Sequence, residues 1–306
     1  MSRNSNLSSP YTPYTMIDLT EATRVEPPAE FPSTPDQIAA HLKSKSTHIF
    51  IAVPCYGCRM NIKFLTSLLR LESFCLVHGI RLTFEFIGNE SLITRGRCIL
   101  AERAMKSNAT HLLFIDADIA FDVITVLRLA AFNAPVTAGI YSKKGLDFNN
   151  VIAAGTAAVE NGSELDPIKL GAKLADAALG FNLNLAPGKT NHVVSNGFIE
   201  VLDAATGMMM IRLDSLRALR EIYYDDLRVA NDIPSSRDIM PEYVALFETF
   251  ICPDTRRFLS EDYAFCRKCQ TNGMRVFADL TAPLVHVGEL THTSNLSKMI
   301  SARLEL

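Results

Sequence analysis

From residue 48 onward, short apolar runs alternate with stretches of helical periodicity, and this alternation limits the fold more than any other feature. The run at 48–54 is apolar and ends at Pro54, and residues 80–87 alternate apolar and polar side chains, so both are predicted strands. The same pattern predicts strands at 111–115, 135–141, 208–213 and 274–280, and helices at 61–78, 92–107, 122–133, 214–221 and 258–273. It predicts an α/β fold of three layers with a mostly parallel central sheet.

The first 46 residues have a different composition. Six of the chain's 14 prolines fall within the first 35 positions, among many Ser and Thr residues. Such a segment buries too little apolar surface to offset its ordering entropy. We therefore expect a disordered tail over 1–46, with a short helical stretch from Pro35, and one folded domain over 47–306. The middle of that domain, 142–201, is weakly patterned apart from an expected helix at 167–179.

The charge balance and the apolar runs restrict the partners and the compartment. The chain has 30 basic and 33 acidic residues, so no global basic surplus is available for duplex nucleic acid, although a local basic groove stays possible. Charged residues interrupt the most apolar stretch, 111–140, so no transmembrane segment is expected. The N-terminus lacks the apolar core of a secretion signal, and seven cysteines is an odd number. A cytoplasmic protein with reduced thiols is expected.

Two CxxC pairs, Cys55/Cys58 and Cys266/Cys269, suggest either a zinc site or unrelated thiols. The pairs start 266 − 55 = 211 residues apart, much farther than in a zinc ribbon. The second pair lies in a predicted helix, where a spacing of three is typical of a buried face. Buried thiols are the favoured interpretation.

The triplet Asp116-Ala117-Asp118 follows the apolar run LLFI directly. Ligands of open α/β sheets bind outside the carboxyl ends of the strands, which is where such a triplet would lie. Two carboxylates there suit Mg²⁺ or Mn²⁺ together with a diphosphate. The alternative is a solvated turn in which an Asp caps the next helix. Motifs for dinucleotide binding, P-loops, α/β-hydrolases and zincins are absent from the sequence.

Six segments of the chain, taken together and in this order, carry further information: VPCYGCR, GNESLITRGRCILAERAM, THLLFIDADIAF, AGIYSKK, ATGMMMIRLDSL and FLSEDYAFCRKCQTNGMRVFADLTAPLVHVG. Together, over about 48–290, they resemble GT-A-type nucleotide-sugar glycosyltransferases, closest to the family-2-like enzymes of bacterial and bacteriophage genomes. The resemblance implies a GT-A (Rossmann-like) fold and a nucleotide-diphosphate sugar as donor.

The resemblance also implies roles for residues on the donor side. Pro54 and Tyr56 would flank the nucleotide base, and Arg95 and Arg97 would lie near the nucleotide or its diphosphate. Independently of the resemblance, Lys143 and Lys144 follow the predicted strand at 135–141, where they could add a second cationic contact to the phosphates. A solvated helix face is the alternative for the arginines, and an exposed surface is the alternative for the lysines.

Further roles concern the metal and the reaction. Asp116 would contact the ribose or the metal, and Asp118 and His286 would ligate Mn²⁺ or Mg²⁺. Asp262 would be the catalytic base of an inverting transfer, with Glu261 beside it shaping the acceptor site. An ordinary loop histidine and a pair of helix-capping acids are the corresponding alternatives.

The predicted function is a metal-dependent transfer of a sugar from a nucleotide-diphosphate donor to an acceptor hydroxyl, with inversion. The acceptor would be a glycan or, for a viral gene, a modified DNA base. A nucleotidyltransferase of similar fold and a catalytically inactive glycan-binding GT-A module are the alternatives. The sequence does not specify the sugar, the nucleotide or the oligomeric state.

Overall fold

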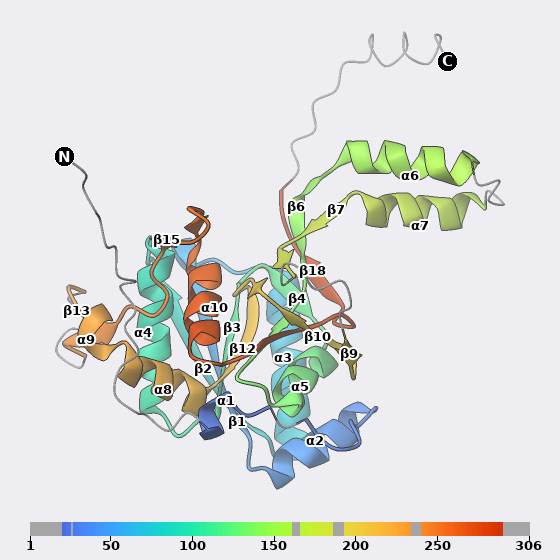
Figure 1. Cartoon of the computed structure of the whole chain (residues 1–306). Helices are drawn as coiled ribbons and strands as arrows, with labels where there is room; N and C mark the ends of the chain where they lie inside the picture. The colour runs from blue at the N-terminus through green and yellow to red at the C-terminus, as the bar shows by residue number, and fades with distance from the viewer. Residues whose placement is uncertain (1–19, 26, 161–165, 186–192, 234–239, 290–306) are drawn as a thin grey trace, which may run out of the picture.

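A central sheet of eight strands organises the chain (Figure 1). The computed structural model describes residues 20–25, 27–160, 166–185, 193–233 and 240–289. In spatial order the strands are β2 (Arg81–Gly88), β1 (His48–Cys55), β3 (His111–Ile115), β12 (Met208–Arg212), β5 (Val136–Gly139), β17 (Val276–Asp279), β10 (Phe198–Val201) and β9 (Val194–Ser195).

Most strands of this sheet run in one direction. Strands β2, β1 and β3 pair in parallel, as do β5 and β17. Strand β12 lies between β3 and β5 and is antiparallel to both, so it joins the two parallel groups while keeping their directions the same. Strands β10 and β9 extend the edge beyond β17 in antiparallel pairing. The predicted α/β class with a mostly parallel sheet is confirmed.

Helices cover both faces of the sheet and complete the three predicted layers (Figure 1). One face carries α2 (Pro35–Ser44), α3 (Ile62–His78) and α5 (Val123–Phe132), and the other carries α4 (Ile93–Lys106), α8 (Leu213–Ile222) and α10 (Glu261–Thr271). Successive side chains of a strand point to opposite faces, so Phe50 and Ala52 join one core while Ile49 and Ile51 join the other.

The folded part of the chain extends further toward the N-terminus than the expected start at residue 47. Helix α2 begins with a capping box formed by Thr34 and Gln37, and its Ile38 and Leu42 are buried in the core beside α5. Short helix α1 (Thr20–Thr23) packs against α8. Local composition missed this because the core contacts that order α2 come from distant residues. Residues 1–19 of the expected tail lie outside the described residues.

A helical arm projects from the body (Figure 1). It consists of β6 (Ser142–Leu146), α6 (Phe148–Glu160), α7 (Pro167–Ala177) and β7 (Leu179–Phe181). The expected helix at 167–179 corresponds to α7, and α6 was not predicted. None of the described residues of α6 and α7 is buried, so the arm contributes little to the core.

Short elements complete the fold: η1 (Tyr56–Cys58), β4 (Ile119–Phe121), β8 (Leu183–Asn184), β11 (Asp203–Ala204), α9 (Tyr224–Leu227), β13 (Arg228–Ala230), β14 (Glu242–Val244), β15 (Phe250–Ile251), β16 (Phe258–Leu259) and β18 (Leu284–His286). Strand β18 pairs with β4 and thereby brings the end of the described chain back to the Asp116–Asp118 turn. Within the described residues, no helix combines the length and apolar character needed to span a bilayer.

Candidate active-site cleft

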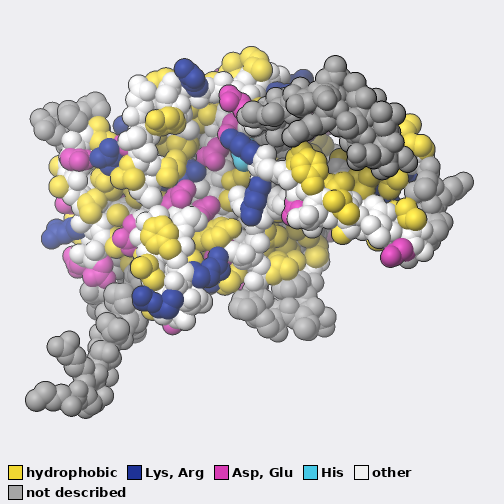
Figure 2. Space-filling view, turned by 90° about the horizontal axis from the view of Figure 1, so that it is seen from above, with side chains coloured by type: hydrophobic (Ala, Val, Ile, Leu, Met, Phe, Trp, Pro, Cys, Tyr) yellow, Lys and Arg dark blue, Asp and Glu magenta, His cyan; other side chains and the backbone are white. Residues whose placement is uncertain are grey.

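An open cleft of about 670 Å³ lies at the carboxyl ends of β1 and β3. Its lining includes predicted site residues from four distant parts of the chain: Pro54, Tyr56, Arg97, Asp116, Asp118 and Glu261. Arg59, Met60, Asn61, Ile93, Ala117 and Glu289 complete the lining. Seen from above, acidic and basic side chains are intermixed across the middle of this face (Figure 2). The position is the one at which open α/β sheets bind ligands.

Backbone hydrogen bonds hold the Asp116–Asp118 turn in place. The Asp116 amide donates to the Gly207 carbonyl at 3.0 Å, and the Asn61 amide donates to the Ala117 carbonyl at 2.8 Å. The Val287 amide donates to the Asp118 carbonyl at 2.9 Å. Because β3 itself is buried along its length, the turn extends from a rigid strand end. The two carboxylates are therefore presented by a fixed backbone.

Arg97 links the turn to the start of helix α10. Its guanidinium is only 3% exposed and donates to Asp116 Oδ1 at 3.0 Å and to Glu261 Oε1 at 3.3 Å. Burial raises the pKa of Glu261, and the Arg97 charge opposes that rise. Arg97 Nη1 is buried and has no hydrogen-bond partner among the described residues. An unsatisfied buried donor beside an open cleft is suited to an oxygen atom of a ligand.

Asp118 faces Lys144 and His286. Lys144 Nζ lies 2.5 Å from Asp118 Oδ2, and His286 Nε2 lies 3.8 Å from Asp118 Oδ1. His286 Nδ1 is 2.7 Å from the Ser142 carbonyl oxygen, which only accepts hydrogen bonds. Nδ1 therefore carries a proton, and Nε2 is the ring nitrogen that is directed toward Asp118. The Tyr141 ring contacts His286 edge to face at a centroid distance of 5.1 Å and fixes its orientation.

These residues fit a divalent cation in part. A carboxylate and a neutral imidazole nitrogen are both ligand types for Mn²⁺, and the hydrogen bond at Nδ1 leaves His286 Nε2 as the ring nitrogen available for ligation. Asp116, the third predicted ligand, is bound to Arg97 instead. Within the described residues, no group of three His, Cys, Asp or Glu side chains converges on one point. The protein's own contribution to such a site is the Asp118–His286 pair, so a bound cation would need further ligands from a phosphate or water.

Four predicted site residues lie outside the cleft lining: His286, which faces Asp118, and Arg95, Lys143 and Asp262. Arg95 turns away from it and pairs with Glu90 at 2.9 Å and with Asp232 at 3.1 Å. Lys143 lies on β6, where its stem approaches Gly180 of β7. Asp262 Oδ1 accepts the Tyr263 amide at 2.8 Å and the Ser260 hydroxyl. Asp262 still lies close enough to Tyr141 and Glu261 for its charge to raise the pKa of both.

The chain matches no known family model. No curated protein matches it either. Among solved structures, it is similar to A197 from STIV, with 12% identity over 79% of this chain and 86% of that one, at a TM-score of 0.42. It is also similar to GalNAc-T7 solved with UDP, GalNAc and Mn²⁺, with 11% identity over 80% of this chain and 44% of that one, at a TM-score of 0.39. These likenesses assign no family to the chain.

The structure adds two residues that sequence inspection did not place in the site. Tyr141 is buried beneath the turn, and its hydroxyl accepts the Gly207 amide at 3.1 Å. A Cβ atom on Gly207 would lie 2.2 Å from the Tyr141 hydroxyl oxygen, so only glycine fits. In the sequence, the feature that pointed to a close contact here was the single glycine, Gly207, directly before the predicted strand at 208–213.

Three of the four CxxC thiols, those of Cys55, Cys266 and Cys269, are buried as the favoured interpretation predicted, while that of Cys58 is exposed. Cys266 and Cys269 are fully buried on one face of α10, and all seven cysteines are free. Cys58 is exposed at the end of η1, while Cys55 is buried at the end of β1. No zinc ligand set is found among the described residues.

Proposed function

We propose that the cleft binds a nucleotide-diphosphate sugar and transfers the sugar to an acceptor hydroxyl with inversion. The observation that carries the proposal is the convergence of Asp116, Asp118, Arg97, Lys144 and His286 at the carboxyl edge of a mostly parallel sheet. Mixed cationic and anionic groups around a rigid turn suit a diphosphate with an associated cation.

Residues at the end of β1 supply the nucleotide side of the cleft. Pro54 lies one residue before the end of β1, and Tyr56 is 76% exposed, so its ring is free to stack on a base. Asp116 is held by Arg97, so that its carboxylate can accept hydrogen bonds from a ribose. Arg97 Nη1 would donate to a ligand oxygen. Arg95 and Lys143 would act only at the periphery of the bound donor.

Asp118 and His286 would hold Mn²⁺ or Mg²⁺, which when bound would neutralise charge that develops on the diphosphate leaving group. Lys144 places a cation against the same carboxylate and would contact the phosphates directly. Because Lys144 is a flexible side chain and 45% exposed, it can move from Asp118 to a phosphate oxygen when the donor enters.

The acids at the start of α10 would take the proton. As the acceptor oxygen bonds to the anomeric carbon and the bond to the diphosphate oxygen breaks, the hydroxyl proton passes to a carboxylate. Asp262 is assigned this base role, because its carboxylate lies in the first turn of α10, directly after Glu261 of the cleft lining. Glu261 would position Arg97 and border the acceptor.

Product identity tests the proposal. Purified protein is incubated with a panel of nucleotide-diphosphate sugars and Mn²⁺, with water or simple sugars as acceptors, and the nucleotide products are separated by chromatography. The proposal expects release of a nucleoside diphosphate from at least one donor. In a parallel incubation with a nucleoside triphosphate and a sugar phosphate, formation of pyrophosphate would instead identify a nucleotidyltransferase. A glycan-binding protein without enzyme activity would release neither product.

A pair of conservative variants tests the base assignment. Asp262→Asn keeps the hydrogen-bond acceptor but cannot take a proton, so we expect about a 10³-fold loss in kcat with unchanged donor affinity. Glu261→Gln should lower kcat less, by about tenfold, because it only weakens the contact with Arg97. Full turnover by Asp262→Asn together with a large loss in Glu261→Gln would transfer the base role to Glu261.

A further inference from the structure

The arm carries an apolar stripe along one side of α6. Phe148, Ile152 and Val159 lie within about 40° of one another around the helix, at 100° per residue. Each is 66–68% exposed, although a row of large apolar side chains on a helix usually packs against another element. The arm projects from the body of the protein (Figure 1), and the described part of the chain does not cover this stripe.

Helix α7 packs beside the stripe and not over it. The half-buried residues of α6, which face α7, are Val151, Ala154, Gly155 and Ala158. Their centre lies about 90° around the helix from the centre of the stripe. The stripe therefore lies on one broad face of the α6–α7 hairpin.

The charged residues of α7 lie on the opposite broad face. Helix α7 contacts α6 through its half-buried Leu170 and Leu174. About 90° from this contact line, Gly171 lies on the same face as the stripe, whereas Lys169 and Lys173 lie on the other. A Cβ atom on Gly171 would meet nothing within 4 Å among the described residues, so this part of the face is open. The hairpin thus has one open, uncharged face and one charged face.

The stripe is complementary to itself when two copies of α6 lie antiparallel. With the two-fold axis between positions 153 and 154, Phe148 lies opposite Val159 of the second copy, and Ile152 lies opposite Gly155. A Cβ atom on Gly155 would meet Leu174 Cδ2 at an ordinary 3.7 Å, so packing within the arm does not require glycine there. In the paired helices, the space above Gly155 would receive the bulky Ile152 side chain, as small and large residues interlock in helical bundles.

The charge of the arm favours a second copy of the chain over a lipid surface. Across the two helices, Glu160 and Asp176 balance Lys169 and Lys173. A segment that binds an anionic membrane typically has a strongly cationic polar face. Two uncharged apolar faces can instead meet without electrostatic repulsion.

The size of the face determines how stable the pairing is. Helices of 13 and 11 residues, side by side, offer a face about 20 Å long and about 20 Å wide, or about 400 Å² on each copy. A standard stable interface buries about 800 Å² per partner. The pairing should therefore be reversible, with a dissociation constant in the micromolar range.

We infer that the arm is a dimerisation element, in which the α6–α7 hairpins of two copies pair antiparallel through their uncharged faces and form a four-helix bundle. The inference does not depend on the proposed function of the cleft. Strand β6 at the base of the arm also carries Lys144 and Ser142, which contact Asp118 and His286. Pairing of the arms would therefore fix a strand that borders the cleft.

Sedimentation equilibrium of the full chain at several protein concentrations tests the inference. Phe148→Lys and Val159→Glu each place a charge in the stripe. The double variant combines them, and the two new charges, 11 positions apart on one helix, meet only across an antiparallel pair. Leu76→Glu is the matched control, because Leu76 is a similarly exposed apolar residue on α3, in the body of the protein.

We expect a concentration-dependent dimer for the wild type and for Leu76→Glu, with dissociation constants within about twofold of each other. Each single arm variant should dimerise at least about tenfold more weakly, and the double variant should recover at least about threefold. Unchanged circular dichroism would show that the variants keep the fold.

A wild type that is monomeric at every concentration would overturn the inference. If such a monomer dimerised once the chain was shortened to end at Glu289, residues 290–306 would be the occupant of the face. If it bound vesicles of anionic lipid, the occupant would be a membrane. Equal weakening by Leu76→Glu, or no recovery in the double variant, would also overturn the inference.

Discussion

At the scale of single residues, Gly207 supports the start of the Asp116–Asp118 turn. Its carbonyl accepts the Asp116 amide, and its amide donates to the Tyr141 hydroxyl. Gly207→Ala would place a methyl group 2.2 Å from that hydroxyl oxygen and force Tyr141 to move. We expect the free energy of unfolding to fall by about 1–3 kcal/mol, measured by urea denaturation.

Gly145→Ala is the matched control, because nothing lies within 4 Å of the added methyl group at that position. Its free energy of unfolding should stay within about 0.5 kcal/mol of the wild type. Equal stability of Gly207→Ala and Gly145→Ala would show that Tyr141 does not pack against Gly207 as described.

His111 should make stability depend on pH. Burial, with a smaller contribution from the Arg212 charge, lowers the pKa of His111 to about 4 from its ordinary 6.5. Below pH 6.5 the unfolded chain binds the proton while the folded chain does not, so stability falls as the pH drops from 6.5 to 4. The His111→Gln variant has no titratable group at this position, so its stability should not fall for this reason. We expect the wild type to lose about 3 kcal/mol relative to His111→Gln over that range. Parallel pH profiles would contradict the buried neutral ring.

Sequence alone could not separate neighbouring candidates in the site. Arg95 and Arg97 are two positions apart on α4, about 200° around the helix, so only one of them can face the cleft. The structure places Arg97 there and pairs Arg95 with Glu90 and Asp232. The choice depends on which face of α4 packs on the sheet, and that is a tertiary property.

At the scale of elements, the arm is separable from the core. The Asp147 amide donates to the Ala178 carbonyl at 2.9 Å, so the two ends of the helical hairpin already meet. No described residue of α6 or α7 is buried. Replacing residues 148–177 by a short Gly-Ser turn should leave the free energy of unfolding within about 1 kcal/mol of the wild type, measured by thermal and urea denaturation. A large loss of stability would mean that the arm contributes to the core.

Buried elements were easier to predict than exposed ones. The strands at 48–54 and 111–115 were found because their apolar patterns reflect burial in the sheet. The antiparallel direction of β12 left no trace in its own sequence, because a strand buried on both faces has the same apolar pattern in either direction. Helix α6 escaped prediction because its exposed faces are rich in Ala and Asn rather than sharply divided.

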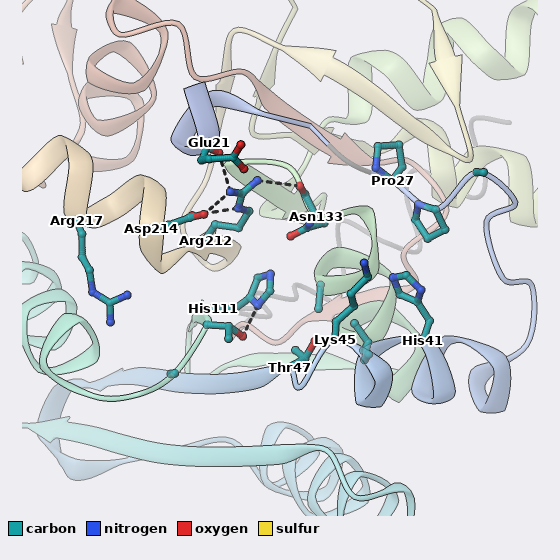
Figure 3. A pocket seen from close by; sticks show the side chains of 16 residues that line it. Glu21, Pro27, His41, Lys45, Thr47, His111, Asn133, Arg212, Asp214 and Arg217 are labelled. Atoms are coloured by element: carbon teal, nitrogen blue, oxygen red, sulfur yellow. Dashed lines mark hydrogen bonds and ion pairs between the residues drawn. The ribbon is translucent and has the colours of Figure 1, made fainter. Parts of the chain in front are cut away.

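At the scale of the whole molecule, the sheet connects two polar cavities. Strands β1 and β3 begin at a cavity lined by His111 (Figure 3) and end at the cleft lined by Pro54 and Asp116. The cleft brings together residues that are far apart in the sequence. Arg97 and Glu261, which are in contact there, are 164 positions apart. Motif order pointed to the members of this site, while their contacts depended on the three-layer packing.

The central claim is that the cleft binds a nucleotide-diphosphate sugar through Asp118 and a divalent cation. Calorimetric titration of the donors, with and without Mn²⁺, tests it on the wild type, Asp118→Asn and the exposed control Asp225→Asn. We predict Mn²⁺-dependent binding of at least one donor by the wild type and Asp225→Asn, weakened at least about tenfold in Asp118→Asn. Absence of Mn²⁺-dependent binding of any donor by the wild type, or undiminished binding by Asp118→Asn, would contradict the claim.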